Sequence, residues 1–138
     1  KIMEEVPGVT LHFDQGQRRM EQTRFSFDKL KEETGCGIED VNNRLVDYGI
    51  PEIWESHHPL TVPEPFTPEP CESYSKEDLD YYVAVLRKVA LECYEDPEMV
   101  KGAPYKASKH QSTNAFADDY NEIASTWRQY VKKYRYKK

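Results

Sequence analysis

The feature that most constrains the fold is a long apolar stripe with helical spacing in the second half of the chain. Five residues, three or four positions apart, form this stripe: Leu79, Val83, Leu86, Ala90 and Cys93. Such spacing places them on one face of an α-helix, so it predicts an amphipathic helix that packs on a core. Ser75 and Asp78 precede the stripe at the spacing of an acidic capping box, and they predict where the helix begins.

Two shorter helices are predicted on either side of it. Apolar residues at helical spacing predict a helix of about eleven residues that ends at Gly49, where a left-handed residue is favoured: Ile38, Val41, Leu45 and Tyr48. Further along, Asp96 is expected to cap a short helix whose first residue is Pro97.

Two segments near the start alternate between apolar and polar residues. Residues 9–13 and 23–27 are therefore predicted to be strands, and the short polar link between them allows antiparallel pairing. Together with the helices, they predict a small α/β fold of the α+β kind. We expect a short, mainly antiparallel sheet with helices packed on one face.

Composition places this chain among folded proteins. It has 138 residues, enough for one domain, and its aromatic residues can fill a core although 32% of the residues are charged. It has no apolar run long enough for a membrane helix. The three Cys lack Cys-x-x-Cys spacing, so we expect free thiols in a reducing compartment and a soluble, cytoplasmic protein.

Several short motifs follow one another in a distinctive order. They are Leu30-Lys31-Glu32-Glu33-Thr34-Gly35, Asp47-Tyr48-Gly49, Val62-Pro63-Glu64, Glu69-Pro70-Cys71-Glu72-Ser73, Lys76-Glu77-Asp78-Leu79-Asp80 and Ala103-Pro104-Tyr105. Over about residues 20 to 106, this order resembles the C-terminal part of the pyridoxal-phosphate-dependent glycine decarboxylase of the glycine cleavage system, the P-protein. The resemblance is strongest to the second subunit found where that enzyme is split in two.

The resemblance implies a role as the small C-terminal domain of a fold-type I pyridoxal-phosphate enzyme. Such a domain would close the active site and contribute to a subunit interface. The parent enzyme would decarboxylate glycine and pass the aminomethyl group to a lipoyl-carrying protein. The implied partners are the rest of the parent subunit, a second P-protein subunit and that lipoyl-carrying protein.

The family's cofactor Lys, carried in a Ser-x-x-His-Lys-like segment, has no counterpart in this sequence. None of the four His is followed by Lys, and without that nucleophile the cofactor chemistry cannot start. We therefore expect no catalytic residue and no bound pyridoxal phosphate in this chain, whereas the full-length parent would bind the cofactor. Because the chain starts at Lys1, it is expected to be an inactive piece of a longer protein.

The resemblance also places a Pro-rich loop near the mouth of the cofactor pocket. The candidate residues in this loop are His57, His58, Glu69, Cys71, Glu72 and Ser73. Glu69 and Glu72 match the family motif, and a shifted His57 or His58 could replace the family's missing His. Alternatively, these acids only shape a Pro-rich turn and the His lie at the surface. No metal site is expected, because adjacent His point to opposite faces of an extended segment.

The end of the chain is basic and aromatic. Residues 128–138 carry six basic side chains and no acid, and apolar spacing predicts an amphipathic helix over residues 118–138. The predicted organisation is thus a domain at 1–106, a linker at 107–117 and this helix. The helix could bind nucleic acid or anionic lipid, or it could dock on an acidic neighbour. The acidic remainder of the chain favours docking, so no nucleic-acid or membrane partner is expected.

Two other functions stay open at this point. The altered loop and the basic tail would also suit a diverged, non-catalytic interaction domain. A related pyridoxal-phosphate enzyme that acts on another amino acid would share the same fold.

Overall fold

The computed structural model describes residues 1–13, 22–51, 53, 61–107, 127–128 and 131. The chain divides into two units, Lys1–Ser108 and Lys109–Lys138. In the second unit, Trp127, Arg128 and Val131 are helical, and the first two are exposed. The rest of the predicted tail helix at 118–138, and nearly all of the predicted linker at 107–117, lie outside the described residues.

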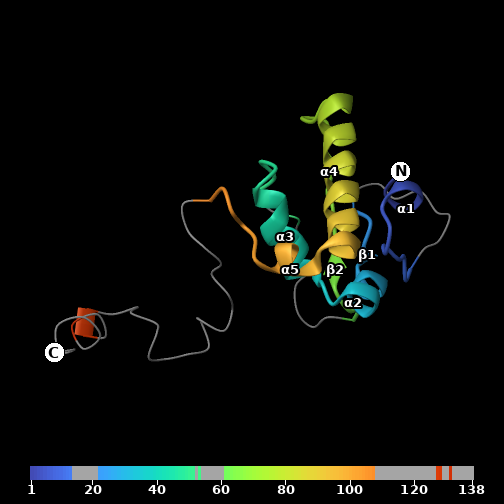
Figure 1. Ribbon diagram of the computed structural model, residues 1–138. Coiled ribbons are helices and arrows are strands. Elements are labelled where there is room, and N and C mark those ends of the chain that lie inside the picture. The colour runs from blue at the N-terminus through green and yellow to red at the C-terminus, as the bar shows by residue number, and fades with distance from the viewer. Residues whose placement is uncertain (14–21, 52, 54–60, 108–126, 129–130, 132–138) are drawn as a thin grey trace. The chain divides into compact units, whose positions relative to one another are not determined.

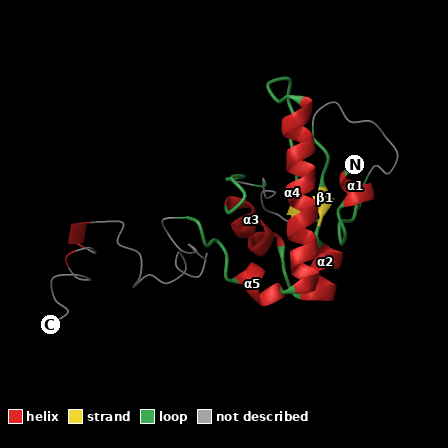
Figure 2. Cartoon of the chain, turned by 45° about the horizontal axis from the view of Figure 1, so that its top comes forward, coloured by secondary structure: helices red, strands yellow, loops and turns green. Residues whose placement is uncertain are grey.

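The first unit is built around one long helix. In chain order the elements of its described residues are α1 (Ile2–Glu5), β1 (Phe25–Ser26), α2 (Asp28–Thr34), α3 (Ile38–Val46), β2 (Pro65–Phe66), α4 (Lys76–Glu95) and α5 (Pro97–Lys101). Helix α4 contacts each of the other four helices, and the two strands form a small antiparallel sheet (Figures 1 and 2). The predicted small α/β fold is confirmed.

The sheet pairs β1 with a strand that lies forty residues away in the sequence. Phe25 stands opposite Phe66, and Ser26 stands opposite Pro65. Pro65 has no N–H to donate, which an outer strand of a small sheet tolerates. The predicted strand at residues 23–27 is confirmed at β1, and the Val62-Pro63-Glu64 motif lies directly before β2.

The predicted strand at residues 9–13 is wrong except at one position. Thr10 alone pairs with Ser26, in an isolated antiparallel bridge with N···O distances of 2.8 and 3.0 Å. The flanking residues bind the start of α2 instead, because the Gly8 carbonyl accepts from the Leu30 N–H at 3.1 Å and His12 Nε2 lies 2.6 Å from Asp28 Oδ2. These contacts hold the residues on both sides of Thr10 against α2.

The sequence gave no sign of helices α1 and α2. Helix α1 buries none of its residues, and α2 buries only Leu30. With at most one buried residue each, neither helix carries the repeated apolar positions from which a helix is predicted.

The predicted starts of α4 and α5 are confirmed, whereas α3 ends at Val46, three residues before the predicted Gly49. Ser75 Oγ accepts from the Asp78 N–H at 3.0 Å while Asp78 Oδ2 accepts from the Ser75 N–H at 3.0 Å, which is the expected capping box. Gly49 has φ +81°, and Ile50 donates across it to the Leu45 carbonyl at 3.1 Å. Asp96 Oδ1 caps α5 by accepting from the Met99 N–H at 3.1 Å.

The core lies between α4, the sheet and α3. Phe66 stacks on Phe25 and Phe27, with ring centroids 5.4 and 4.6 Å apart. The same buried cluster contains apolar residues of α3 and α4: Ile38, Val41, Leu45, Val83, Val85, Leu86, Val89, Ala90 and Cys93. The three Cys are free thiols, as predicted, with Cys36 and Cys93 buried and Cys71 exposed. In the part of the chain that the structure describes, every helix is too short or too polar to cross a membrane.

Candidate functional site

The Pro-rich loop predicted from the sequence runs over the surface between β2 and α4. Glu69 Oε1 accepts from Gln22 Nε2 at 2.9 Å, and the Tyr74 N–H closes a turn on the Cys71 carbonyl at 3.2 Å. The side chains of Cys71, Glu72 and Ser73 are exposed. Glu69 and Glu72 are therefore available to another surface, and the described residues do not enclose them in a site.

The other two candidate residues for the mouth of the cofactor pocket are histidines. His57 and His58 lie outside the described residues. Their position near the cofactor pocket, beside Glu69 and Glu72, thus stays a prediction.

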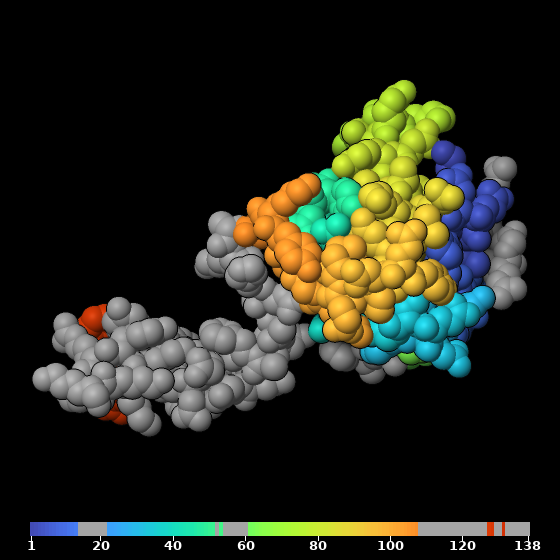
Figure 3. Space-filling model, viewed as in Figure 1, coloured from blue at the N-terminus to red at the C-terminus, as the bar shows by residue number. Residues whose placement is uncertain are grey.

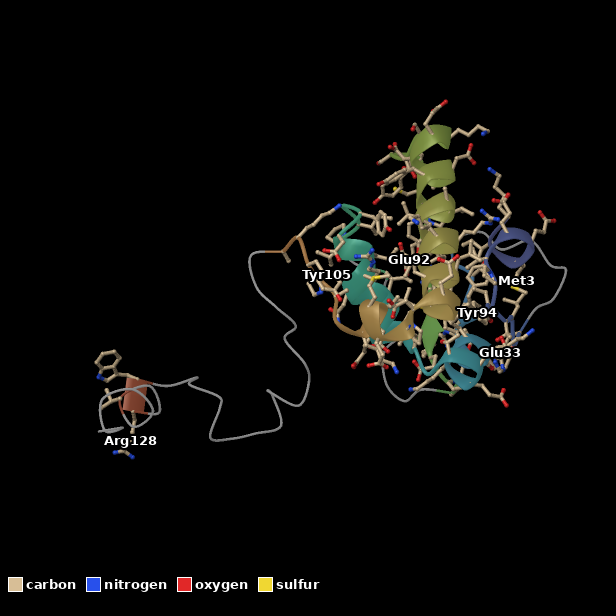
Figure 4. The ribbon with its side chains drawn as sticks, viewed as in Figure 1. Met3, Glu33, Glu92, Tyr94, Tyr105 and Arg128 are labelled. Atoms are coloured by element: carbon tan, nitrogen blue, oxygen red, sulfur yellow. The ribbon has the colours of Figure 1, made fainter. Side chains whose placement is uncertain are left out.

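A second group of polar residues, which sequence reasoning missed, joins α3, α4 and the segment after α5. We call it the Arg44 cluster; its members are Arg44, Asp47, Tyr48, Lys88, Glu92, Tyr105 and Lys106. Figure 4 labels Glu92 where α4 faces α3, and Tyr105 beyond α5. The cluster brings together charged groups that are far apart in the sequence.

Arg44 is the centre of this cluster. Its Nε donates to Glu92 Oε2 at 2.8 Å, and its Nη1 donates to Asp47 Oδ2 at 2.8 Å. Tyr48 donates its hydroxyl to Glu92 Oε1 at 2.5 Å, and Lys88 Nζ lies 3.3 Å from the same oxygen. The Arg44 guanidinium thus binds two carboxylates, and its planar shape with several N–H donors suits such paired contacts.

Asp47 connects two of the sequence motifs that carry the family resemblance. Its Oδ1 accepts from the backbone N–H groups of Tyr105 and Lys106, each at 2.7 Å. The guanidinium of Arg44 also lies 5.8 Å from the centre of the Tyr105 ring. The Asp47-Tyr48-Gly49 turn and the Ala103-Pro104-Tyr105 segment are therefore held together by one carboxylate, whose side chain is only 1% exposed.

The electrostatics of the Arg44 cluster keep both acids ionised. Burial alone would raise the pKa of the Glu92 carboxyl, but hydrogen bonds from Arg44 and Tyr48 outweigh it and lower that pKa. Burial likewise opposes ionisation of Asp47, yet hydrogen bonds from the Lys106 N–H, Arg44 and the Tyr105 N–H lower its pKa below the usual 3.8. Burial and the Glu92 carboxylate raise the pKa of Tyr48, which therefore remains a hydrogen-bond donor.

These lowered pKa values predict acid sensitivity. A carboxyl whose pKa is lower in the folded than in the unfolded state stabilises the fold above its unfolded pKa, 3.8 for Asp47 and 4.5 for Glu92, and loses that contribution as the pH falls through the folded value. We expect the urea concentration at the unfolding midpoint to be constant around pH 6 and to be markedly lower at about pH 3. The drop should be smaller in an Arg44→Met variant, and an equal drop in both proteins would contradict this role.

The Val62-Pro63-Glu64 motif has a structural role of its own. Glu64 Oε2 accepts from the Ile38 N–H at the start of α3 at 2.8 Å, and its other oxygen pairs with Lys31. The Glu64 carbonyl accepts from the Phe27 N–H at 3.0 Å, and the residue holds φ +45° to make these contacts. Glu64 thus caps α3 and connects it to the sheet.

Three of the described Lys, each paired with a carboxylate, do not suit the role of the cofactor-bearing Lys. Forming an imine needs an amine that can lose its proton, whereas carboxylates raise the pKa of three Lys by hydrogen bonding: Lys1 by Asp80, Lys88 by Glu92 and Lys101 by Glu98. Among the described residues, no three His, Cys, Asp or Glu side chains gather as metal ligands would. The described residues provide an exposed acidic loop and, between α3 and α4, the Arg44 cluster.

Comparisons with known proteins give the family. The chain is 36% identical over 129 residues to the probable glycine dehydrogenase (decarboxylating) subunit 2 of Thermococcus gammatolerans, covering 92% of this chain and 23% of that protein. It is 40% identical over 114 residues to the protein of the same description from Pyrococcus horikoshii, covering 81% and 22%. It is 45% identical over 78 residues to the one from Thermosipho melanesiensis, covering 56% and 16%.

The chain is homologous to the C-terminal region of glycine dehydrogenase (decarboxylating) subunit 2. It spans about a fifth of the length of the curated relatives it matches. No family model matches the chain, and no solved structure matches it significantly. The resemblance predicted from the motifs is confirmed, and it extends beyond residues 20 to 106, since the longest of these alignments covers 92% of the chain.

Proposed function

We propose that this chain is the C-terminal domain of a pyridoxal-phosphate-dependent glycine dehydrogenase (decarboxylating) of the glycine cleavage system. The observation that carries this proposal is the homology to the second subunit of that enzyme over most of the chain. When bound in the full-length protein, the cofactor would supply the electron sink for decarboxylation. This domain would contribute residues that position the substrate and enclose the active site, and the rest of the protein would contribute the nucleophile.

The exposed loop between β2 and α4 is the part of the domain that we assign to the active-site mouth. Glu69 is held by Gln22, and Glu72 is exposed and forms no ion pair with a described residue. Two carboxylates at a pocket mouth could orient cationic groups and exclude water as the domain closes. Cys71, Ser73 and the two His, His57 and His58, would line the same mouth.

The loop can serve that purpose because both of its ends are held by regular structure. Its far end leads directly into the capping box of Ser75, and its near end leaves the sheet at Phe66. The partners of the domain would be the rest of the parent subunit, a second P-protein subunit and the lipoyl-carrying protein that receives the aminomethyl group. Taken alone, the domain would be inactive.

The role of the loop is tested by neutralising its acids in the full-length protein. Glu72→Gln and Glu69→Gln are each expected to lower kcat/KM for glycine about tenfold, a loss of about 1.4 kcal/mol of transition-state stabilisation. Glu32→Gln is the matched control, because Glu32 is an equally exposed acid on α2. Unchanged kinetics in both loop variants would assign Glu69 and Glu72 to the turn alone.

A further inference from the structure

The first two turns of α4 extend beyond the rest of the domain. We call residues 74–82 the α4 projection. The first buried residue of α4 is Val83, although Leu79 and Tyr81 lie before it and Tyr74 precedes the helix. Figures 1 and 3 show this end of α4, in green to yellow-green, rising past α1 and α3. Large apolar side chains are therefore displayed on a helix end that this unit does not cover.

The α4 projection is held in place despite its exposure. The Ser75 capping box fixes its first turn, and Asp80 accepts hydrogen bonds from Lys1 and Lys76. The Tyr81 hydroxyl donates to the Tyr48 carbonyl at 2.8 Å, which ties the helix to the end of α3. A preorganised apolar surface loses little conformational entropy when it is covered, so it is well suited to association.

We propose that the α4 projection is a docking surface for the part of the longer protein that lies outside this chain. This inference rests on the proposed function. The homologous subunits are about four times as long as the chain, so a domain of this family has a large neighbour to contact. Tyr74, Leu79 and Tyr81 form the apolar centre that such a neighbour would bury.

Charge also indicates what the neighbouring surface contains. The α4 projection carries Glu77, Asp78 and Asp80 against a single cation, Lys76. Glu77 forms no ion pair with any described residue. A second copy of the chain would bring like charges together, whereas an apolar socket with Lys or Arg at its rim would complement the surface.

Hydroxyl-radical footprinting of two proteins tests this proposal. Labelling of Tyr74, Leu79 and Tyr81 should be at least about tenfold slower in the full-length protein than in residues 1–138 alone, because a docked surface excludes solvent. Equal labelling in both proteins would overturn the proposal. Slow labelling of residues 1–138 alone, at concentrations where they form dimers, would also overturn it. The α4 projection would then be covered by a second copy of the chain.

Matched variants extend the test. Leu79 and Leu91 lie on the same helix and are 38% and 36% exposed, so Leu79→Asp and Leu91→Asp should both leave the urea midpoint of residues 1–138 close to that of the unmodified chain. In the full-length protein, Leu79→Asp should restore fast labelling of Tyr74 and Tyr81, and Leu91→Asp should not. Continued protection in Leu79→Asp would contradict an apolar contact centred on Leu79.

The same samples separate this inference from the proposed function. Adding pyridoxal phosphate and then glycine gives an independent absorption readout. Protection without a response to glycine would leave the docking surface standing and refute the proposed activity. A response to glycine without protection would refute the docking surface alone.

Discussion

Replacing Phe66 with Ala is expected to lower the free energy of unfolding of the chain by about 4 kcal/mol, a loss typical of a buried aromatic ring. Phe66 is fully buried and stacks on both Phe25 and Phe27, so no other side chain can fill its place. It also lies in β2 opposite Phe25, which means that the sheet and the core would weaken together. Urea denaturation followed by circular dichroism measures the effect.

The matched control for this substitution is Phe13→Ala. Phe13 is 51% exposed, and its removal should change the free energy of unfolding by no more than about 0.5 kcal/mol. If both variants lost similar stability, the core would not be centred on the stacked rings. A small loss in Phe66→Ala alone would mean that β2 does not pack as described.

Replacing Arg44 with Met is expected to cost about 3 kcal/mol of folding stability, because it leaves the buried Asp47 and Glu92 carboxylates without their shared cation. Asp47 would keep its two backbone N–H donors, and Glu92 would keep Tyr48 and Lys88, which prevents a larger loss. Thermal unfolding near neutral pH measures the change. The segment after α5 should loosen as well, since Asp47 positions it.

Two further variants show whether the loss comes from the charges. Arg44→Met combined with Glu92→Met removes one orphaned carboxylate along with the cation, so the double variant should be more stable than Arg44→Met alone. Arg87→Met is the control for removing an Arg, because Arg87 of α4 is exposed and makes no ion pair with a described residue. A double variant less stable than the single one would show that packing, not charge, explains the effect.

Local signals were sufficient to predict the long helix and its boundaries. The cap at Ser75 and the stripe from Val83 to Cys93 each depend on residues within a few positions of one another, whereas Leu79, predicted on the same core-facing stripe, is 38% exposed. The positive φ of Gly49 and the cap that Asp96 forms before Pro97 are likewise local features. The strand at residues 9–13 failed for the opposite reason: its groups bind α2, a contact that alternation along the chain cannot reveal.

The candidate site also combines a part that local sequence predicts with a part that only the fold reveals. The loop from Glu69 to Ser73 was found through its motif, and the structure places it on the surface without gathering its side chains. The Arg44 cluster was missed because it assembles from α3, α4 and the segment after α5. One signal was present in the sequence, since Asp47 and Tyr105 both lie in motifs shared with the family, but only the fold shows that they meet.

Glycine chemistry in the full-length protein is the central claim, and one titration tests it most directly. Adding pyridoxal phosphate to the full-length protein should produce the absorption band of the protein-bound cofactor, and glycine should then shift that band. Residues 1–138 alone should give no band. A band that does not respond to glycine would indicate another amino-acid substrate, and a full-length protein that binds no cofactor would contradict the enzyme account and leave a non-catalytic interaction domain.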